Sequence, residues 1–165
     1  MEELIRRARQ GDGEAFAELI AGQKQTLYKV ARSYLHNDTD AADAIGETVL
    51  ACCEKLDTLR EPKYFRTWLT RILINKCRDL LRQQGRCVPL ETAAEPAYHE
   101  PGQARAEFLA LLDSLDEKYR TVLLLYYGEG FRVAEIAQML DLKEETVKTR
   151  LKRARAGFKQ VYEAE

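Results

Sequence analysis

The chain has 165 residues, of which 45% are hydrophobic and 32% are charged, and its formal net charge is −1. This composition is typical of a soluble globular protein, and any attraction to nucleic acid has to come from local surfaces, not from the overall charge. No run of about 18 apolar residues occurs, so we expect no membrane-spanning helix. The charged N-terminus, MEELIRRARQ, is unlike a secretory signal, so we expect a cytoplasmic protein.

The cysteines do not form a pattern typical of a metal or redox site. None of them forms a C-x-x-C pair, and only His36 and His99 could complete a zinc site. In a reducing compartment this predicts buried or incidental thiols, with a redox or zinc site as the minor alternative. We therefore expect no metal and no cofactor. The four cysteines are Cys52, Cys53, Cys77 and Cys87.

Apolar residues recur at three- and four-residue spacing along nearly the whole chain, and no segment has the alternation of a strand. The first part should form an all-α domain, residues 1–86. Its polar turn, residues 36–40, offers Asp38, Thr39 or Asp40 as a helix cap. The expected elements are two amphipathic stretches within 4–35 interrupted near 11–13, helix 41–56, a loop at 60–63 and helix 64–84.

Residues 87–104 differ in composition from the rest. They contain three of the four prolines, three Glu and no Lys or Arg, which predicts a flexible linker. A second helical domain, residues 105–165, should follow. Its expected helices are 105–115, 117–127, 133–140 and 143–162.

The last of these helices has two different sides. At about 100° per residue, Val147, Leu151, Ala154 and Phe158 fall together on an inner side. The helix at 133–140 and the tight junction 141–143 that joins it to this last helix predict a helix-turn-helix, with Leu142 buried in the turn. The outward residues are Glu145, Thr146, Lys148, Thr149, Lys152 and Arg153.

In a helix-turn-helix the second helix enters the DNA major groove. Lys and Arg would bind phosphates, and Glu145, Thr146, Thr149 and Arg153 could contact base edges. The alternative interpretation is a solvated cationic face on a structural helix.

A second stripe runs along the expected helix 64–84, beside a core side made of Phe65, Leu69, Ile72 and Leu80. Aromatic rings interleaved with Arg suit opened or single-stranded nucleic acid, because rings stack on bases while guanidinium groups meet phosphates. The alternative is that the aromatics are core residues and the Arg are solvated. The stripe consists of Tyr64, Trp68, Arg71, Asn75, Arg78 and Arg82.

The expected helix 41–56 has an acidic outer face. Asp43, Glu47 and Glu54 surround Leu50, which predicts docking on a basic protein partner, with a solvated acidic face as the alternative. Its inward stripe is predicted to be Ala42, Ile45, Val49, Cys52 and Leu56.

Taken together, these segments resemble a bacterial sigma factor of the extracytoplasmic-function (ECF) group of the sigma-70 family. The resemblance spans nearly the whole chain and rests on the following segments: GDGEAFAELI, DAADAIGETVLACCEKL, YFRTWLTRILINKCRDLLRQQGR, LLDSLDEKYRTVLLLYYGEGFRVAEIAQML and ETVKTRLKRARAGFK. It implies sigma region 2 at 1–86 and sigma region 4 at 105–165, with neither region 1.1 nor region 3.

The resemblance also implies roles for the outward residues. Asp43, Glu47 and Leu50 match the segment that binds the clamp helices of the largest subunit of core RNA polymerase. The loop 59–63 and the helix after it match the part that opens and reads the −10 element, with Tyr64, Trp68, Arg71, Asn75 and Arg78 as its site residues. Thr146, Lys148, Thr149, Lys152 and Arg153 match the surface that reads the −35 element.

Further implications concern partners. The resemblance implies contact with the flap of the second-largest polymerase subunit and a linker near the RNA exit path. It also implies control by a membrane-anchored anti-sigma factor and a part in envelope stress. It implies neither a catalytic residue nor a small-molecule substrate. Two departures are Asp116 in place of a common Pro and Asp141 in place of a common Gly, and Glu145 adds a carboxylate near the DNA.

Two other classes of protein remain as alternatives from the residues. One is a dimeric helix-turn-helix repressor or activator, which would need neither the acidic docking face nor the aromatic stripe. The other is a protein-interaction module that mimics part of a sigma factor, which would not need an intact cationic closing helix.

Overall fold

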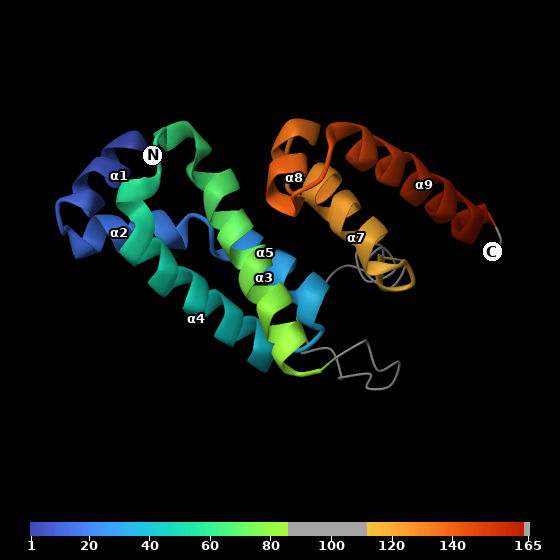
Figure 1. The fold of residues 1–165 in the computed structure, drawn as a ribbon, viewed down its shortest axis with the longest axis horizontal. Helices are drawn as coiled ribbons and strands as arrows, with labels where there is room; N and C mark the ends of the chain where they lie inside the picture. Colours follow the sequence, from blue (N-terminus) through green and yellow to red (C-terminus); the bar gives the residue numbers. More distant parts are fainter. Residues whose placement is uncertain (86–111, 164–165) are drawn as a thin grey trace. The chain divides into compact units, whose positions relative to one another are not determined.

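The computed structural model describes residues 1–85 and 112–163, with side chains up to residue 159, in two compact units, Met1–Cys87 and Val88–Glu165. All regular elements in the described part are helical (Figure 1), which confirms the all-α prediction. The predicted linker 87–104, Cys87, His99 and most of the predicted helix 105–115 lie outside the described residues. Of the helices described, none is both long and apolar enough to cross a membrane.

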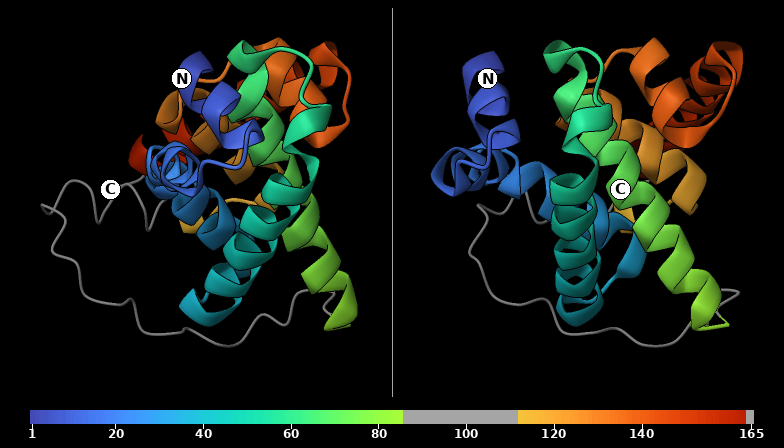
Figure 2. Two further views of the ribbon diagram at one scale, coloured as in Figure 1. Left: turned by 90° about the vertical axis from the view of Figure 1, so that its left-hand side faces the viewer. Right: turned by 60° about the vertical axis from the view of Figure 1, so that its left-hand side comes forward.

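In the first unit, three helices pack against one another in pairs and two shorter helices pack beside them. Figure 2 shows α4 and α5 side by side in both views. The short helix α1 also contacts the two 3-10 turns that lead from α4 to α5. The elements are α1 (Glu2–Arg9), α2 (Gly13–Ala21), α3 (Lys24–Leu35), α4 (Asp38–Lys55), η1 (Leu56–Thr58), η2 (Pro62–Tyr64) and α5 (Phe65–Gln83).

The core of this unit lies where α3, α4 and α5 meet. Each large apolar side chain that is fully buried there stabilises the fold by about 1.5–3 kcal/mol relative to an exposed one. Two buried threonines are satisfied locally, since Thr48 and Thr70 each donate a hydrogen bond to the carbonyl four residues earlier. The largest buried side chains of the bundle are Leu27, Leu35, Phe65, Leu69, Leu73 and Ile74.

The predicted inward stripe of α4 is partly wrong. Ala42 is exposed, and Ile45 and Val49 are only half-buried, whereas Cys52 is fully buried and Leu56 nearly so. The reason is that α4 packs against two helices, so its buried face is broad and lies where small residues allow close approach. The buried residues of α4 are Ala41, Ala44, Thr48, Ala51 and Cys52.

The same broad contact changes the core side of α5. Phe65 and Leu69 are buried as predicted, but Ile72 and Leu80 are only half-buried. Leu73, Ile74 and Cys77, which a single stripe leaves out, are completely buried.

Two details before α4 also differ from the prediction. Residues 4–35 form three helices and not two, because the chain also breaks at Gly22 and Gln23. The cap of α4 is Asn37, whose side-chain oxygen accepts a hydrogen bond from the Asp40 N–H at 2.8 Å. Asp38, predicted as a cap, is the first residue of the helix.

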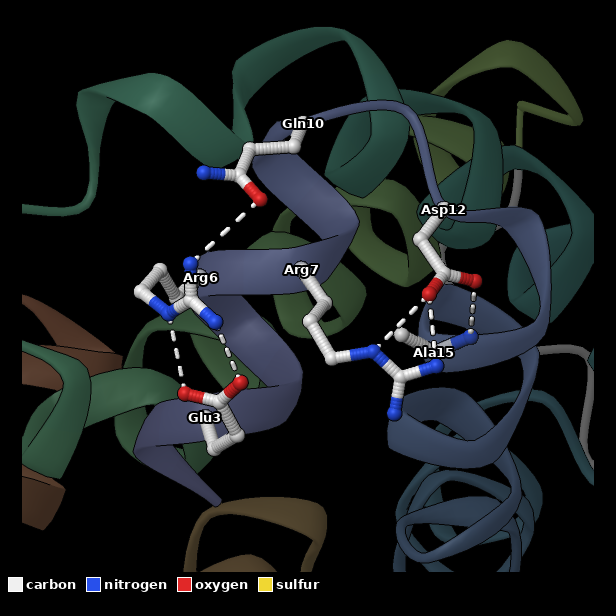
Figure 3. Close-up of polar contacts among 6 residues, drawn as sticks. All are labelled: Glu3, Arg6, Arg7, Gln10, Asp12 and Ala15. Atoms are coloured by element: carbon white, nitrogen blue, oxygen red, sulfur yellow. Dashed lines mark hydrogen bonds and ion pairs between the residues drawn. The ribbon is translucent and has the colours of Figure 1, made fainter.

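Charged side chains form hydrogen bonds on α1 and at the turn between α1 and α2 (Figure 3). Asp12 caps α2 by accepting a hydrogen bond from the Ala15 N–H at 3.0 Å, and its other oxygen accepts one from Arg7 Nε at 2.8 Å. On the outer side of α1, Arg6 donates to Glu3 and Gln10. The bond from Ala15 and then the Arg7 guanidinium lower the pKa of Asp12 below its usual value of 3.8.

The second unit contains α7 (Glu117–Leu123), the π-helical turn η3 (Leu124–Gly128), α8 (Val133–Leu140) and α9 (Glu144–Glu163). The predicted helix 117–127 is therefore α-helical up to Leu123 and continues as a π-helical turn. The bounds of α8 are those predicted, and α9 begins and ends one residue later than expected. Phe158, predicted on the inner side of α9, is half-buried, while Val147, Leu151 and Ala154 are buried.

The turn between α8 and α9 has the geometry of a helix C-cap. Asp141 adopts the left-handed conformation at φ 57°, and the Leu142 N–H donates to the Ala137 carbonyl at 2.9 Å. Asp tolerates this conformation better than most residues, which fits its place at this turn. Leu142, predicted to be buried, is half-buried.

We expect Asp12→Ala to lower the melting temperature of the first unit by about 4 °C, because α2 loses its cap and Arg7 loses its partner. Trp68 is the only tryptophan and lies in this unit, so its fluorescence reports this unit's unfolding. Asp12→Asn is the matched control, since Asn keeps the cap but loses the charge.

The effect should depend on pH in one direction. The pKa of Asp12 is lower in the folded than in the unfolded state, so its stabilisation is complete above 3.8 and disappears as pH falls through the folded value. The difference between wild type and Asp12→Ala should therefore shrink below pH 3.8. An equal difference at every pH would assign the whole effect to something other than the carboxylate.

Candidate nucleic-acid and polymerase interfaces

The acidic face of α4 points away from the bundle. Asp43, Glu47 and Glu54 are exposed, and Leu50 is 65% exposed, an unusual position for a leucine. Glu47 reaches across to α5, where its Oε2 lies 3.2 Å from Lys76 Nζ. This leaves an apolar side chain surrounded by carboxylates, a surface suited to a basic partner with an apolar contact.

The stripe on α5 is open to solvent on the side away from the core. Tyr64 is 47% exposed, and Arg71, Asn75 and Arg82 are exposed, whereas Trp68 and Arg78 are half-buried. The Trp68 ring lies 6.1 Å from the ring of the buried Phe65, so it is held against the core while one side stays accessible. The interpretation of these aromatics as core residues is therefore wrong for Tyr64 and half right for Trp68.

The loop 59–63, which precedes this stripe, begins at buried residues and then becomes exposed. Leu56 and Leu59 are buried, whereas Arg60, Glu61 and Lys63 are exposed. Lys63 Nζ lies 2.7 Å from Glu61 Oε2 and 4.8 Å from the centre of the Tyr64 ring. The hydrogen bond to Glu61 raises the pKa of Lys63, which keeps this cation charged beside the aromatic ring.

The outward side of α9 carries the second predicted DNA surface. Lys148, Thr149, Lys152 and Arg153 are exposed, and Thr146 is half-buried. Within the described residues, Lys152 and Arg153 make no ion pair. Lys148 differs, because its Nζ lies 2.8 Å from Glu145 Oε1, a contact that raises the pKa of this lysine and offsets part of its charge.

Beside this surface lies an open hollow of about 390 Å³ that the sequence did not predict. Lys118 and Tyr119 from α7 form one wall, and Thr149, Arg150 and Arg153 from α9 form the other. With Glu145 and Thr146, the lining includes three cations, one carboxylate and three hydroxyl groups. The sequence around Lys118 and Tyr119 does not indicate a binding surface. A charged residue beside an aromatic one in a helix predicts only an ordinary exposed face.

The three described cysteines differ in their exposure to solvent. Cys52 and Cys77 are buried and Cys53 is exposed, and burial raises the pKa of Cys52 to about 12. Among the described residues, no group of three or more His, Cys, Asp or Glu side chains is arranged to hold a metal ion.

Comparison with known proteins identifies the family. Residues 19–87 match the family model for Sigma-70 region 2, and residues 105–156 match the one for Sigma-70, region 4. The RNA polymerase sigma factor NccH of Alcaligenes xylosoxydans xylosoxydans is 34% identical over 169 residues, covering 94% of this chain and 90% of the relative. The chain belongs to the sigma-70 family of RNA polymerase sigma factors.

The ECF group is supported by a further relative. The ECF RNA polymerase sigma factor SigW of Bacillus subtilis (strain 168) is 25% identical over 177 residues, covering 96% of this chain and 95% of the relative. The resemblance noted from the sequence is therefore confirmed, and the protein is a sigma factor of ECF type that acts in transcription initiation.

Solved structures agree with this assignment. CnrH in complex with the cytosolic domain of CnrY has a TM-score of 0.73 at 32% identity, covering 98% of this chain and 96% of the other. The sigma factor RpoE in complex with the anti-sigma factor NepR from Bartonella quintana has a TM-score of 0.76 at 23% identity, covering 91% and 98%, and shows the same fold.

Proposed function

We propose that this sigma factor recruits core RNA polymerase to promoters by using three separate faces, one on α4, one on α5 and one on α9. The observation that carries the proposal is the cationic hollow beside the outward face of α9, on the second helix of a helix-turn-helix. Such a hollow suits the phosphate backbone of duplex DNA running past a helix in the major groove. The protein itself contributes binding and positioning, and catalysis belongs to the polymerase.

The second unit is proposed to hold the −35 element. Thr149, Lys152 and Arg153 lie on the exposed side of α9, where they can contact base edges and phosphates. Lys118 and Arg150 in the hollow add charge toward the same DNA. Glu145 holds Lys148 and places a carboxylate at the start of the helix, which would disfavour phosphates there and leave that position for a base edge that donates a hydrogen bond, such as the cytosine amino group.

The first unit is proposed to capture the opened −10 element. Tyr64 and Trp68 offer ring faces on which bases can stack, and Arg71 and Arg78 lie along the same stripe for phosphates. Asn75, exposed between these two arginines, presents an amide that can read a base edge. Duplex DNA upstream and single-stranded DNA downstream would then be bound by different units joined by the segment 87–104.

The α4 face is proposed to dock on the clamp helices of the largest polymerase subunit. Its carboxylates would attract a basic surface, and Leu50 would insert an apolar side chain at the centre of the contact. The second unit would contact the flap of the second-largest subunit, which places the two units at separate points of the polymerase.

Control by an anti-sigma factor is part of the proposal. CnrH is bound by the cytosolic domain of CnrY, and RpoE is bound by the anti-sigma factor NepR. A protein of this kind, anchored in the inner membrane, would cover the same faces and keep the sigma factor in the cytoplasm away from polymerase until an envelope stress releases it.

The direct test is run-off transcription with purified protein, sigma-free bacterial core polymerase and fragmented genomic DNA of the source organism. We expect discrete transcript starts that share two upstream elements, which would also reveal the promoter sequence. Core polymerase alone is the control. Absence of starts together with absence of binding to core would contradict the proposal and favour a DNA-binding regulator that acts without polymerase, whose dimeric state could then be tested by light scattering.

We expect Leu50→Arg to weaken binding to core polymerase about tenfold or more, because a cation replaces the apolar centre of the acidic face. Ala42→Arg is the matched control, since Ala42 is exposed on the same helix about 80° around its axis from Leu50. Binding would be measured by competition for core against the wild-type protein. Equal losses in both variants, or none in a folded Leu50→Arg protein, would remove this face from the proposal.

Substitutions in the hollow and on α9 should change the binding of holoenzyme to duplex promoter DNA in different ways. Lys118→Gln should weaken binding to all sequences and reduce the slope of log affinity against log salt by about 1, as for a lost phosphate contact. Arg153→Ala should in addition relax sequence preference at one position of the upstream element. Both should leave core binding unchanged, and loss of core binding would show misfolding or a wrong face.

A further inference from the structure

The guanidinium group of Arg9, on α1, connects the N-terminal helix to the loop before α5. Its Nε and Nη2 donate to the carbonyl oxygen of Leu56 at 3.3 and 3.2 Å, and Nη2 also donates to the carbonyl oxygen of Leu59. The two leucines are 47 and 50 residues away along the chain. One side chain therefore holds both ends of the short segment that leaves α4.

The carbonyl groups at the end of α4 have few partners in their own segment, because the last carbonyl groups of a helix lack partners within it. Within the segment 56–59, the Leu56 carbonyl accepts one hydrogen bond, from the Leu59 N–H at 3.3 Å. Donors from elsewhere in the fold can therefore stabilise this segment. A guanidinium suits the task, because its donors form a rigid planar fork that can reach two acceptors at once. The charge on Arg9 makes these bonds stronger than those between neutral groups.

The held segment leads directly into the proposed single-strand surface. Leu59 is followed by the exposed residues 60–63, by Tyr64 and by the start of α5 at Phe65. Leu56 and Leu59 are themselves buried, so fixing their backbone fixes where the exposed loop begins.

We infer that Arg9 is a positioning residue for capture of the −10 strand: it acts through the loop 59–63, without contacting DNA. The inference rests on the proposed function of the α5 face. It gives α1 a role although this helix lies before the matched residues 19–87. The helix is itself held in place by Ile5, which is completely buried, and by the pair between Arg7 and Asp12.

Removing this side chain should not unfold the unit. Arg9 is exposed and borders an open hollow of about 180 Å³ with Phe16, Cys53 and Leu56, so its loss leaves no sealed cavity. The test is Arg9→Gln in the full-length protein. Arg6→Gln is the matched control, since Arg6 lies on the same helix and, among the described residues, donates hydrogen bonds to Glu3 and Gln10 and to none of the loop residues (Figure 3).

Two measurements separate positioning from other roles. The first is hydrogen exchange of the free protein, in which the Leu59 and Tyr64 amides should exchange faster in Arg9→Gln and be unchanged in Arg6→Gln. The second uses holoenzyme and a single-stranded oligonucleotide that carries the downstream element mapped by run-off transcription. We expect its affinity to fall about tenfold in Arg9→Gln, with the same salt slope as wild type and partial recovery in Arg9→Lys.

The outcomes are decisive in each direction. Faster loop exchange and weaker oligonucleotide binding, with unchanged melting temperature and core affinity, would support the inference. Unchanged oligonucleotide affinity would overturn it, as would a salt slope reduced by about 0.7, which indicates a direct phosphate contact. An equal loss of core affinity would show a merely structural role. Failure of wild-type holoenzyme to initiate would instead reject the proposed function, and the exchange result would still report whether Arg9 holds the loop.

Discussion

Packing of α3, α4 and α5 against one another determines how α4 and α5 are rotated about their own axes. Because successive residues differ by about 100° around a helix, a rotation equal to one residue would turn Leu50 toward the bundle and bring the buried Cys52 outward. Ala41, Ala44 and Ala51 allow close approach at the α4 contact, so larger residues there would separate the helices. The acidic face and the aromatic stripe are therefore both consequences of one core.

Local charge, and not total charge, distinguishes the surfaces. The formal net charge is −1, yet the hollow beside α9 is lined by three cations and one carboxylate, and the outer face of α4 is acidic around Leu50. Exposed ion pairs contribute little to stability, so the pairs Glu47–Lys76 and Glu145–Lys148 can be exchanged for partner contacts at small cost. They keep charged side chains oriented while leaving them available to a stronger partner.

Long helices with one apolar side were predictable from the sequence. Periodicity places α8 at its observed bounds and α9 within one residue, and it assigns the outward residues of both α4 and α9 to the surface. It failed where a helix has two neighbours, as at Ala44 and Ile74, which are buried although the predicted stripes leave them out, because a single stripe underestimates a broad buried face. It also missed Asn37, since several polar residues in that turn can cap a helix and the backbone alone decides which one does.

Contacts between distant segments explain the rest of what the sequence did not reveal. Lys118 joins the α9 surface only because α7 packs beside α9, and Arg9 meets its acceptors only because α1 lies against η1 and η2. A loop has few hydrogen bonds of its own, so its conformation depends on donors supplied from elsewhere in the fold. Buried leucines alone do not fix the direction of the loop that follows them, because apolar contacts are not directional. The directional hydrogen bonds that Arg9 donates to Leu56 and Leu59 add such a constraint from α1.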